Sequence, residues 1–161
     1  MICLGVLQHT PDPKQGFLEL TQFVKPGGEI VVDVYQKTLS ACLQWKYILR
    51  PLTKRIPSRL LYSIIRSVVP LLLPFAVAAH KVFSLIGTRL FPISSYPTLG
   101  LSYSIHKEWS ILDTFDIYSP RYDKPQTVRA VQEWFKEAGL VDVEVFYGPN
   151  GVVGRGKKSG E

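Results

Sequence analysis

The sequence predicts an α/β fold in which parallel strands are followed by a C-terminal antiparallel hairpin, with a helical insertion between the two halves. Three observations support this prediction. Residues 1–36 have a strand, helix and strand pattern, residues 127–153 resume it, and residues 37–107 are helical in periodicity and rich in proline. A chain of 161 residues can bury one ordinary core. We therefore expect a single domain, 1–161, with 37–107 as an insertion or lid.

The first half predicts a right-handed parallel crossover. Residues 2–7 resemble the end of a buried strand, and Thr10 is suited to cap the next helix because Pro11 fits the first helical position. The turn at residues 26–28 ends this helix, since its glycines permit a left-handed backbone. Residues 30–34 are mostly β-branched and predict a strand covered on both faces. The helix has one apolar face, formed by Phe17, Leu18, Leu20, Phe23 and Val24.

The second half predicts a helix followed by two antiparallel strands. Thr127 can cap this helix, and Gly139 lies where a left-handed residue ends it. Alternating valines in 141–145 predict a half-exposed strand, and the turn residues at 147–151 predict its return. Four glycines lie in this part of the chain, but no helix follows them, as a phosphate-cradling loop would require. We therefore expect these glycines to form turns and crowded strand contacts. They are Gly148, Gly151, Gly154 and Gly156.

The insertion is apolar and strongly basic. Between Val34 and Lys107 the chain has ten basic residues and no acidic one, although the whole chain has a net charge of only +6. Such a segment could bind an anionic acceptor, attract a membrane surface, or form a solvated helix face. The basic residues are Lys37, Lys46, Arg50, Lys54, Arg55, Arg59, Arg66, Lys81, Arg89 and Lys107.

Prolines are expected to divide the helices of the insertion. Pro51 should interrupt a helix over residues 39–49, and Pro70 and Pro74 should split the apolar run that follows a second helix. Between Arg66 and Lys81 lie 14 uncharged residues, fewer than the roughly 18 that a membrane span needs. We therefore expect helices packed over the sheet and no transmembrane helix.

Several classes of protein are excluded by composition. Cys3 and Cys42 form no closely spaced pair, so a disulfide framework or a zinc cluster is not expected, and a reducing cytoplasm fits best. No basic segment precedes an apolar stretch at the N-terminus, so no signal peptide is expected. The basic insertion is rich in leucine and proline and has no nucleic-acid-binding motif, so nucleic acid is not expected as a partner.

The order of these motifs resembles a known family. Gly5-Val6-Leu7-Gln8-His9, the turn Lys25-Pro26-Gly27-Gly28, the strand after it and the final helix with its hairpin together resemble the second half of class I S-adenosylmethionine-dependent methyltransferases, of the small-molecule type 11/12 kind. The resemblance covers about 90 residues. It implies a partial Rossmann-like sheet, S-adenosylmethionine as cofactor, and methyl transfer to a small-molecule or lipid-linked acceptor.

The glycine-rich turn and the acidic ribose-binding residue of that family have no counterpart among these 161 residues. We therefore expect the chain to be a C-terminal portion that is inactive or weakly active and binds the cofactor weakly or not at all. An unpaired strand edge beside Ile2, Leu4 and Val6, and apolar surface near Val31 and Phe17, would make it self-associate.

The resemblance implies site residues in two places. Gly5, Leu7 and His9 border the cofactor pocket, and His9 is the candidate catalytic residue, as a base or by orienting an acceptor hydroxyl. His9 could equally cap the adjoining helix or be solvated. No metal site is expected, because histidine and aspartate lack a diagnostic spacing. The candidate acceptor-binding residues, which could instead be turn and anchor residues of a loop, are His106, Asp116, Tyr118, Arg121 and Tyr122.

A second class of function stays open beside the enzyme. The chain could be a non-enzymatic α/β binding module that docks on a partner or a membrane surface through residues 37–107. A cytoplasmic protein, peripheral at the membrane in this second case, fits both interpretations.

Overall fold

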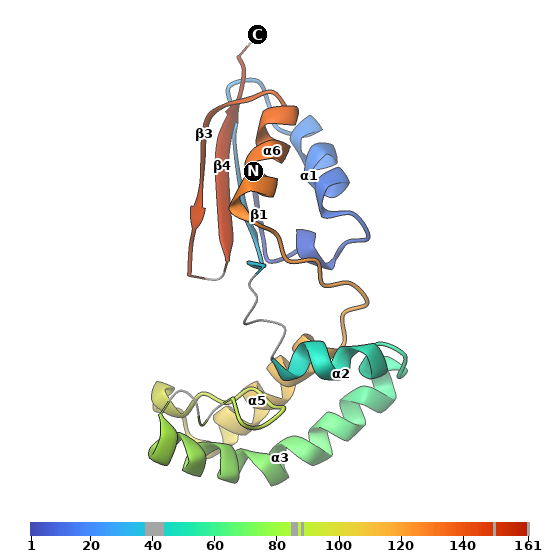
Figure 1. Cartoon of the computed structure of the whole chain (residues 1–161), viewed down its shortest axis with the longest axis vertical. Helices are drawn as coiled ribbons and strands as arrows, with labels where there is room; N and C mark the ends of the chain where they lie inside the picture. The colour runs from blue at the N-terminus through green and yellow to red at the C-terminus, as the bar shows by residue number, and fades with distance from the viewer. Residues whose placement is uncertain (38–43, 85–86, 88, 150, 161) are drawn as a thin grey trace. The chain divides into compact units, whose positions relative to one another are not determined.

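The computed structural model describes residues 1–37, 44–84, 87, 89–149 and 151–160. The chain forms two compact units, and each is described by itself (Figure 1). The first, which we call the sheet unit, contains Met1–Thr38 and Arg121–Glu161. The second, the helical unit, is Leu39–Pro120 and interrupts the first. It extends beyond the insertion 37–107 that the sequence set apart, because a helix after residue 102 belongs to it.

The sheet unit confirms the mixed α/β class. Its sheet has the order β1-β2-β4-β3, in which β1 is parallel to β2 and β4 is antiparallel to both of its neighbours. Figure 1 shows α1 and α6 side by side on one face of this sheet. The strands are β1 (Ile2–Leu4), β2 (Glu29–Val34), β3 (Leu140–Tyr147) and β4 (Val152–Lys158), and the helices are η1 (Leu7–His9), α1 (Pro13–Gln22) and α6 (Val128–Glu137).

Capping explains where the two helices of the sheet unit begin and end. Thr127 caps α6 as predicted, because its side chain accepts a hydrogen bond from the N–H of Ala130, and Gly139 follows with φ of +66°. The prediction that Thr10 caps α1 is wrong. Asp12 is the cap, since its carboxylate accepts the N–H groups of Lys14 and Gln15 at 3.0 and 3.1 Å. Thr10 instead ends η1 and donates its hydroxyl to the carbonyl of Leu7.

The core of the sheet unit forms between the helices and one face of the sheet. The ring of Phe17 lies 4.6 Å from that of Phe135 and 6.0 Å from that of Trp134, so α1 and α6 meet through aromatic side chains. Phe17 is fully buried and Val31 is half-buried, so the expectation of exposed apolar surface near these two residues is wrong at Phe17. The three inward residues of β2, fully buried beneath this layer, are Ile30, Val32 and Val34.

Two glycines of β4 make room for the helix layer. A Cβ atom at Gly154 would lie 2.6 Å from Cε2 of Phe135, and one at Gly156 would lie 3.0 Å from its Cδ1. Real Cβ atoms do not approach ring carbons to 2.6 Å. These glycines are therefore required by close packing, as the sequence predicted for crowded strand contacts.

The outer edge of the sheet is formed by β1, which stands at the end of the strand order and pairs with β2 alone among the described strands. Ile2, Leu4 and Val6 are more than half exposed beside it. This is the open apolar edge that the sequence led us to expect.

The helical unit is built on one long helix and a second one packed along it. The buried residues of α3 (Ser58–Phe83) meet Ile111 and Tyr118 of α5 (Tyr103–Tyr118) and Ile93 of the intervening segment. The unit also contains α2 (Trp45–Thr53) and the short helix η3 (Pro97–Leu99). The buried face of α3 consists of Leu61, Ile65, Val69, Leu73 and Ala76.

The prolines do not divide these helices, so that prediction is wrong. Pro51 lies inside α2, and α3 runs through both Pro70 and Pro74. Each proline removes one backbone N–H donor, but the i, i+4 apolar face continues past it and holds the helix together. The predicted helix over 39–49 lies partly outside the described residues, and its described part begins at Trp45. Within the described chain, α3 is the one helix long and apolar enough to cross a membrane, with mean hydropathy 1.9 over 18 residues.

The packing of β4 against α6 predicts the effect of Gly154→Ala. Alanine is intrinsically better than glycine in a strand, but here its methyl would collide with Phe135. We expect a loss of about 1–3 kcal/mol in the free energy of unfolding, typical of an overfilled core. Urea unfolding followed by circular dichroism measures it. Gly160→Ala, where a Cβ would meet nothing within 4 Å, is the control, and equal stability of the two variants would contradict the packing argument.

Candidate functional site

The carboxyl ends of β1 and β2 lie side by side, because the two strands are parallel and in register from Ile2–Val31 to Leu4–Asp33. Gly5 continues the pairing with a hydrogen bond from its N–H to the carbonyl of Asp33, at 3.1 Å. Its φ of +66° then turns the chain into η1. Ligands of open α/β sheets bind beyond the carboxyl ends of the strands, which is where η1 lies.

Gln8 is the residue that most distinguishes this end of the sheet. Its side chain is fully buried, and neither its amide nitrogen nor its amide oxygen has a hydrogen-bond partner among the described residues. The amide nitrogen lies 3.9 Å from the point that a Cβ of Gly5 would occupy, so the amide lies beside the turn at the end of β1. A buried amide without partners costs about 1–3 kcal/mol, which a ligand could recover by hydrogen bonding.

One ring nitrogen of His9, Nδ1, is engaged in a hydrogen bond. Its Nδ1 lies 3.0 Å from the carbonyl oxygen of Tyr122, and its ring meets that of Tyr35 edge to face at 5.5 Å. A carbonyl oxygen can only accept, so Nδ1 carries the hydrogen and Nε2 presents a lone pair when the ring is neutral. The backbone of Tyr122 therefore orients His9 as a hydrogen-bond acceptor or base. His9 is half-buried, which leaves its ring partly accessible.

Two of the predicted cofactor contacts have structural explanations instead. The side chain of Leu7 is 3% exposed and belongs to the core beneath α1, which explains an apolar residue at this position without a ligand. Gly5 is required by its left-handed backbone, and its N–H is already bonded to Asp33. Gln8, the fully buried residue between Leu7 and His9, was missed by the sequence analysis. The only sequence signal was an amide immediately after a strand, which has no specificity by itself.

The predicted acceptor-binding residues are divided between the two units. Arg121 and Tyr122 belong to the sheet unit, where the guanidinium of Arg121 lies 5.6 Å from the centre of the Tyr122 ring. The other three lie on α5 in the helical unit: His106, Asp116 and Tyr118.

His106 and Tyr118 are buried, and each makes a hydrogen bond with the backbone of the segment before η3. Nε2 of His106 accepts the N–H of Tyr96 at 2.9 Å, and the hydroxyl of Tyr118 donates to the carbonyl of Pro92 at 3.1 Å. Burial lowers the pKa of His106 and raises the pKa of Tyr118 to about 12. Both residues anchor the segment before η3 onto α5. Tyr96 adds a hydrogen bond from its hydroxyl to the carboxylate of Asp113.

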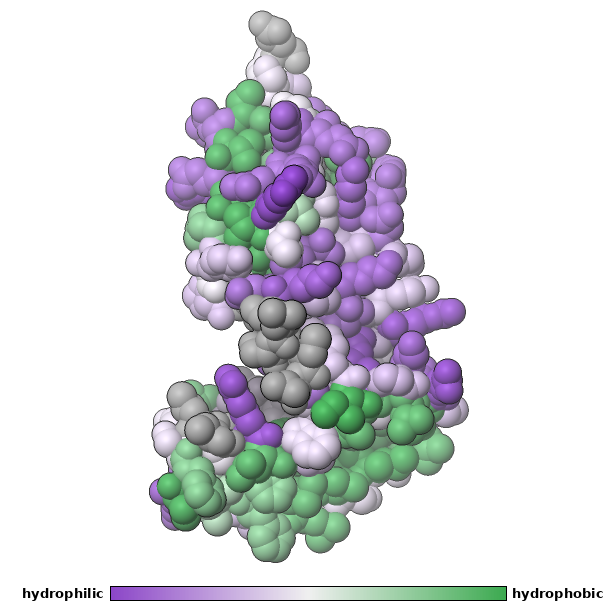
Figure 2. Space-filling model, in the orientation of Figure 1, coloured by the Kyte–Doolittle hydropathy of each residue, from purple (hydrophilic) through white to green (hydrophobic). Residues whose placement is uncertain are grey.

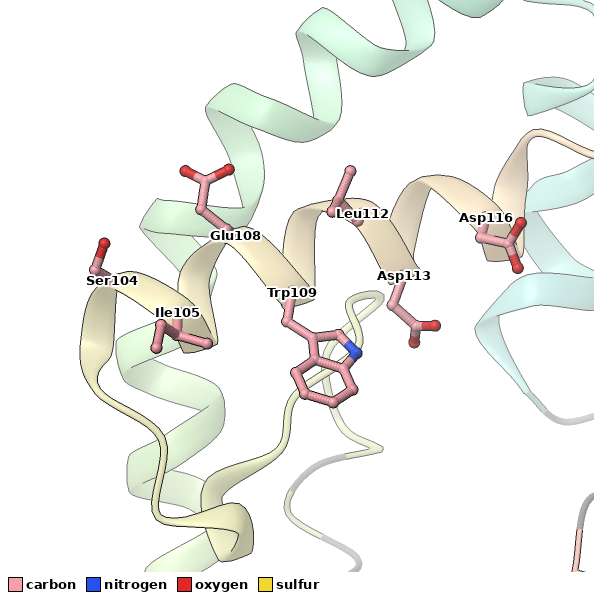
Figure 3. Close-up of a pocket in the computed structure, with 7 residues that line it drawn as sticks. All are labelled: Ser104, Ile105, Glu108, Trp109, Leu112, Asp113 and Asp116. Carbon is pink, nitrogen blue, oxygen red and sulfur yellow. The ribbon is translucent and has the colours of Figure 1, made fainter.

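Two of the predicted residues of the helical unit line hollows. Tyr118 lines one of ≈450 Å³ together with Trp45, Lys46 and Arg89, and Asp116 lines another. This second hollow has a volume of ≈550 Å³ and runs along one helix, α5 (Figure 3). It presents the indole of Trp109 near the carboxylate of Asp113, with no basic side chain in its lining. Its lining residues are Ser104, Ile105, Glu108, Trp109, Leu112, Asp113 and Asp116.

Within the described ranges, no group of three histidine, cysteine, aspartate or glutamate side chains lies close enough to hold a metal ion. No protein-family model matches the chain, and a search of curated proteins finds no match.

Burial of His106 predicts a pH dependence of stability. In the unfolded chain this histidine titrates near 6.5, and its pKa is lower in the folded state. Below about pH 6.5 the unfolded state therefore binds more protons, so stability falls as the pH drops. His106→Gln, whose amide oxygen can still accept from Tyr96, should weaken this dependence. Urea unfolding at pH values from about 7.5 to 5.5 measures it. His80→Gln is the control, and an unchanged slope in His106→Gln would refute the assignment.

Proposed function

We propose that this chain is the carboxyl-terminal part of an S-adenosylmethionine-dependent methyltransferase domain with a Rossmann-like sheet, acting on a small-molecule acceptor. The parallel pair β1–β2 followed by the antiparallel hairpin β3–β4 supports the proposal, because the resemblance implies this order. The single observation that carries it is the buried amide of Gln8, which lacks hydrogen-bond partners in the described structure at the carboxyl end of β1. An amide in such a place suits a polar ligand that completes its hydrogen bonds.

Each residue at this end of the sheet has a defined part in the proposal. S-adenosylmethionine, when bound, supplies an electrophilic methyl group on its sulfonium. The amide of Gln8 would bind polar atoms of the cofactor, and the turn at Gly5 would let the backbone lie close to it. Nε2 of His9 would accept the proton of an acceptor hydroxyl or orient that group, since Nδ1 is occupied by Tyr122. Most of the rate enhancement in such a reaction comes from positioning, so few obligatory side chains are needed.

The alternative is a non-enzymatic binding module. The two functions differ in what they require of Gln8, because a module that docks through the helical unit gives its amide no ligand. A test at Gln8 therefore separates them.

We predict that S-adenosylhomocysteine at millimolar concentration perturbs amide resonances of Gly5, Gln8 and His9 in a ¹⁵N spectrum of the full chain. Weak binding is expected, because the glycine-rich turn and the acidic ribose-binding residue are missing from these residues. Gln8→Leu should abolish the perturbations. The same variant should be as stable as the wild type or more stable by about 1 kcal/mol, since leucine removes an unpaired buried amide without leaving a cavity.

Gln15→Ala, on the exposed face of α1, is the matched control and should leave the perturbations unchanged. Absence of any perturbation, or perturbations that persist in Gln8→Leu, would contradict the proposal. A Gln8→Leu variant that unfolds would show instead that the amide is structural.

A further inference from the structure

Helix α3 has two apolar faces, and only one of them is buried among the described residues. The buried face packs on α5, as described above. The second face is a line of apolar residues spaced three, four or seven apart, which places them on one side of a 3.6-residue helix. They are between 38 and 73% exposed. We call this line the α3 stripe; it consists of Leu60, Ile64, Val68, Leu71, Phe75 and Val82.

The length of the α3 stripe makes it unusual for a surface exposed to water. It covers nearly all of a 26-residue helix, and at 1.5 Å per residue the distance from Leu60 to Val82 is roughly 33 Å. In the same unit, Ile48 and Leu52 of α2 are also more than half exposed. Figure 2 shows hydrophobic residues gathered over the helical unit, whereas the visible surface of the sheet unit is mostly hydrophilic. Continuous apolar surface of this kind marks an interaction site.

The charge of the helical unit indicates what kind of surface it meets. The unit contains nine basic and three acidic residues, whereas the sheet unit contains ten of each. All three acidic residues lie on α5, and α2 and α3 have only basic ones. Arg59 and Arg66 are exposed and lie seven residues apart on one side of α3, next to its buried face and roughly 150° around the helix from the α3 stripe. Exposed Lys54, Arg55 and Lys81 extend the positive charge at the two ends of the helix.

We propose that the helical unit binds the surface of an anionic lipid bilayer, with α3 lying in the membrane plane and the α3 stripe inserted among the acyl chains. This inference goes beyond methyl transfer and does not rest on it. A long exposed apolar face on a helix whose only charged residues are basic suits binding in the plane of a membrane surface. Each basic residue near an anionic lipid surface contributes about 1 kcal/mol of attraction.

Packing explains why α3 lies in the plane rather than across the bilayer. Its buried face contacts α5, which also buries His106, Ser110 and Thr114 and exposes Glu108 and Asp116. A helix that crossed the bilayer would take these polar groups with it or lose its packing partner, and both are costly in hydrocarbon. An in-plane position buries the α3 stripe and leaves the contact with α5 intact.

Vesicle flotation of the full chain tests the proposal. We expect binding to phosphatidylcholine vesicles that contain about 30% phosphatidylglycerol, and binding weaker by about tenfold or more to pure phosphatidylcholine and at high salt. The double variant Leu71→Glu/Phe75→Glu should abolish flotation while its circular dichroism stays that of the wild type, because both side chains are exposed. Arg59→Ala/Arg66→Ala should reduce only the advantage of anionic vesicles. Leu112→Glu is the matched control, an exposed apolar residue of α5 outside the α3 stripe.

Three results would overturn the proposal. Flotation of Leu71→Glu/Phe75→Glu like the wild type would show that the α3 stripe is not the contact. Resistance of the bound wild type to alkaline carbonate extraction would show that α3 spans the bilayer instead of lying on it. Absence of flotation, together with a wild-type dimer that Leu71→Glu/Phe75→Glu converts to monomer in light scattering, would show that a second copy of the chain covers the stripe.

Discussion

The close approach of Phe135 to strand β4 is the constraint on which the sheet unit depends. The ring can lie against the strand because Gly154 and Gly156 present no side chain to it. Since β4 pairs with both β2 and β3, a helix seated on β4 covers the centre of the sheet. Phe17 then packs on Phe135 and sets the position of α1, which begins a few residues after η1. The position of α1, which packs against the segment η1 that contains Gln8 and His9, therefore depends on a contact made on another strand.

The two units differ in the kind of surface that they present. The sheet unit has no net charge by its sequence and keeps its polar features at the end of the parallel strands, where Gln8 is buried and His9 is oriented by Tyr122. The helical unit has all of the excess positive charge and an exposed apolar stripe along α3. A small polar ligand suits the first surface and an anionic bilayer suits the second. A methyltransferase with these two surfaces would suit an acceptor that comes from a membrane. Each surface consists of its own residues, so neither proposal depends on the other.

Local signals in the sequence predicted much of the sheet unit. Thr127 begins α6 and Gly139 follows its end, as expected, because capping and left-handed glycines act within a few residues. For α1 the sequence contains two pairs of a cap residue followed by proline, Thr10-Pro11 and Asp12-Pro13. The carboxylate of Asp12 binds two N–H groups, which settles the choice. In the helical unit, proline predicts a break in the helix by local rules, but tertiary packing along Leu61, Ile65 and Val69 outweighs the lost hydrogen bonds. Leu7 lies in a core with Trp134 and Phe135, and the carbonyl of Gln8 accepts the N–H of Lys124. These partners are more than a hundred positions away, so no local pattern reveals them.

Photo-cross-linking of methyl-labelled S-adenosylmethionine to the full chain, followed by peptide mapping, tests the proposed function most directly, because irradiation traps complexes too weak for calorimetry. The account predicts label in the peptide that contains Gly5, Gln8 and His9, and loss of this label when unlabelled S-adenosylhomocysteine is in excess. Label confined to the helical unit, or no more label than in the chain unfolded by urea, would contradict it.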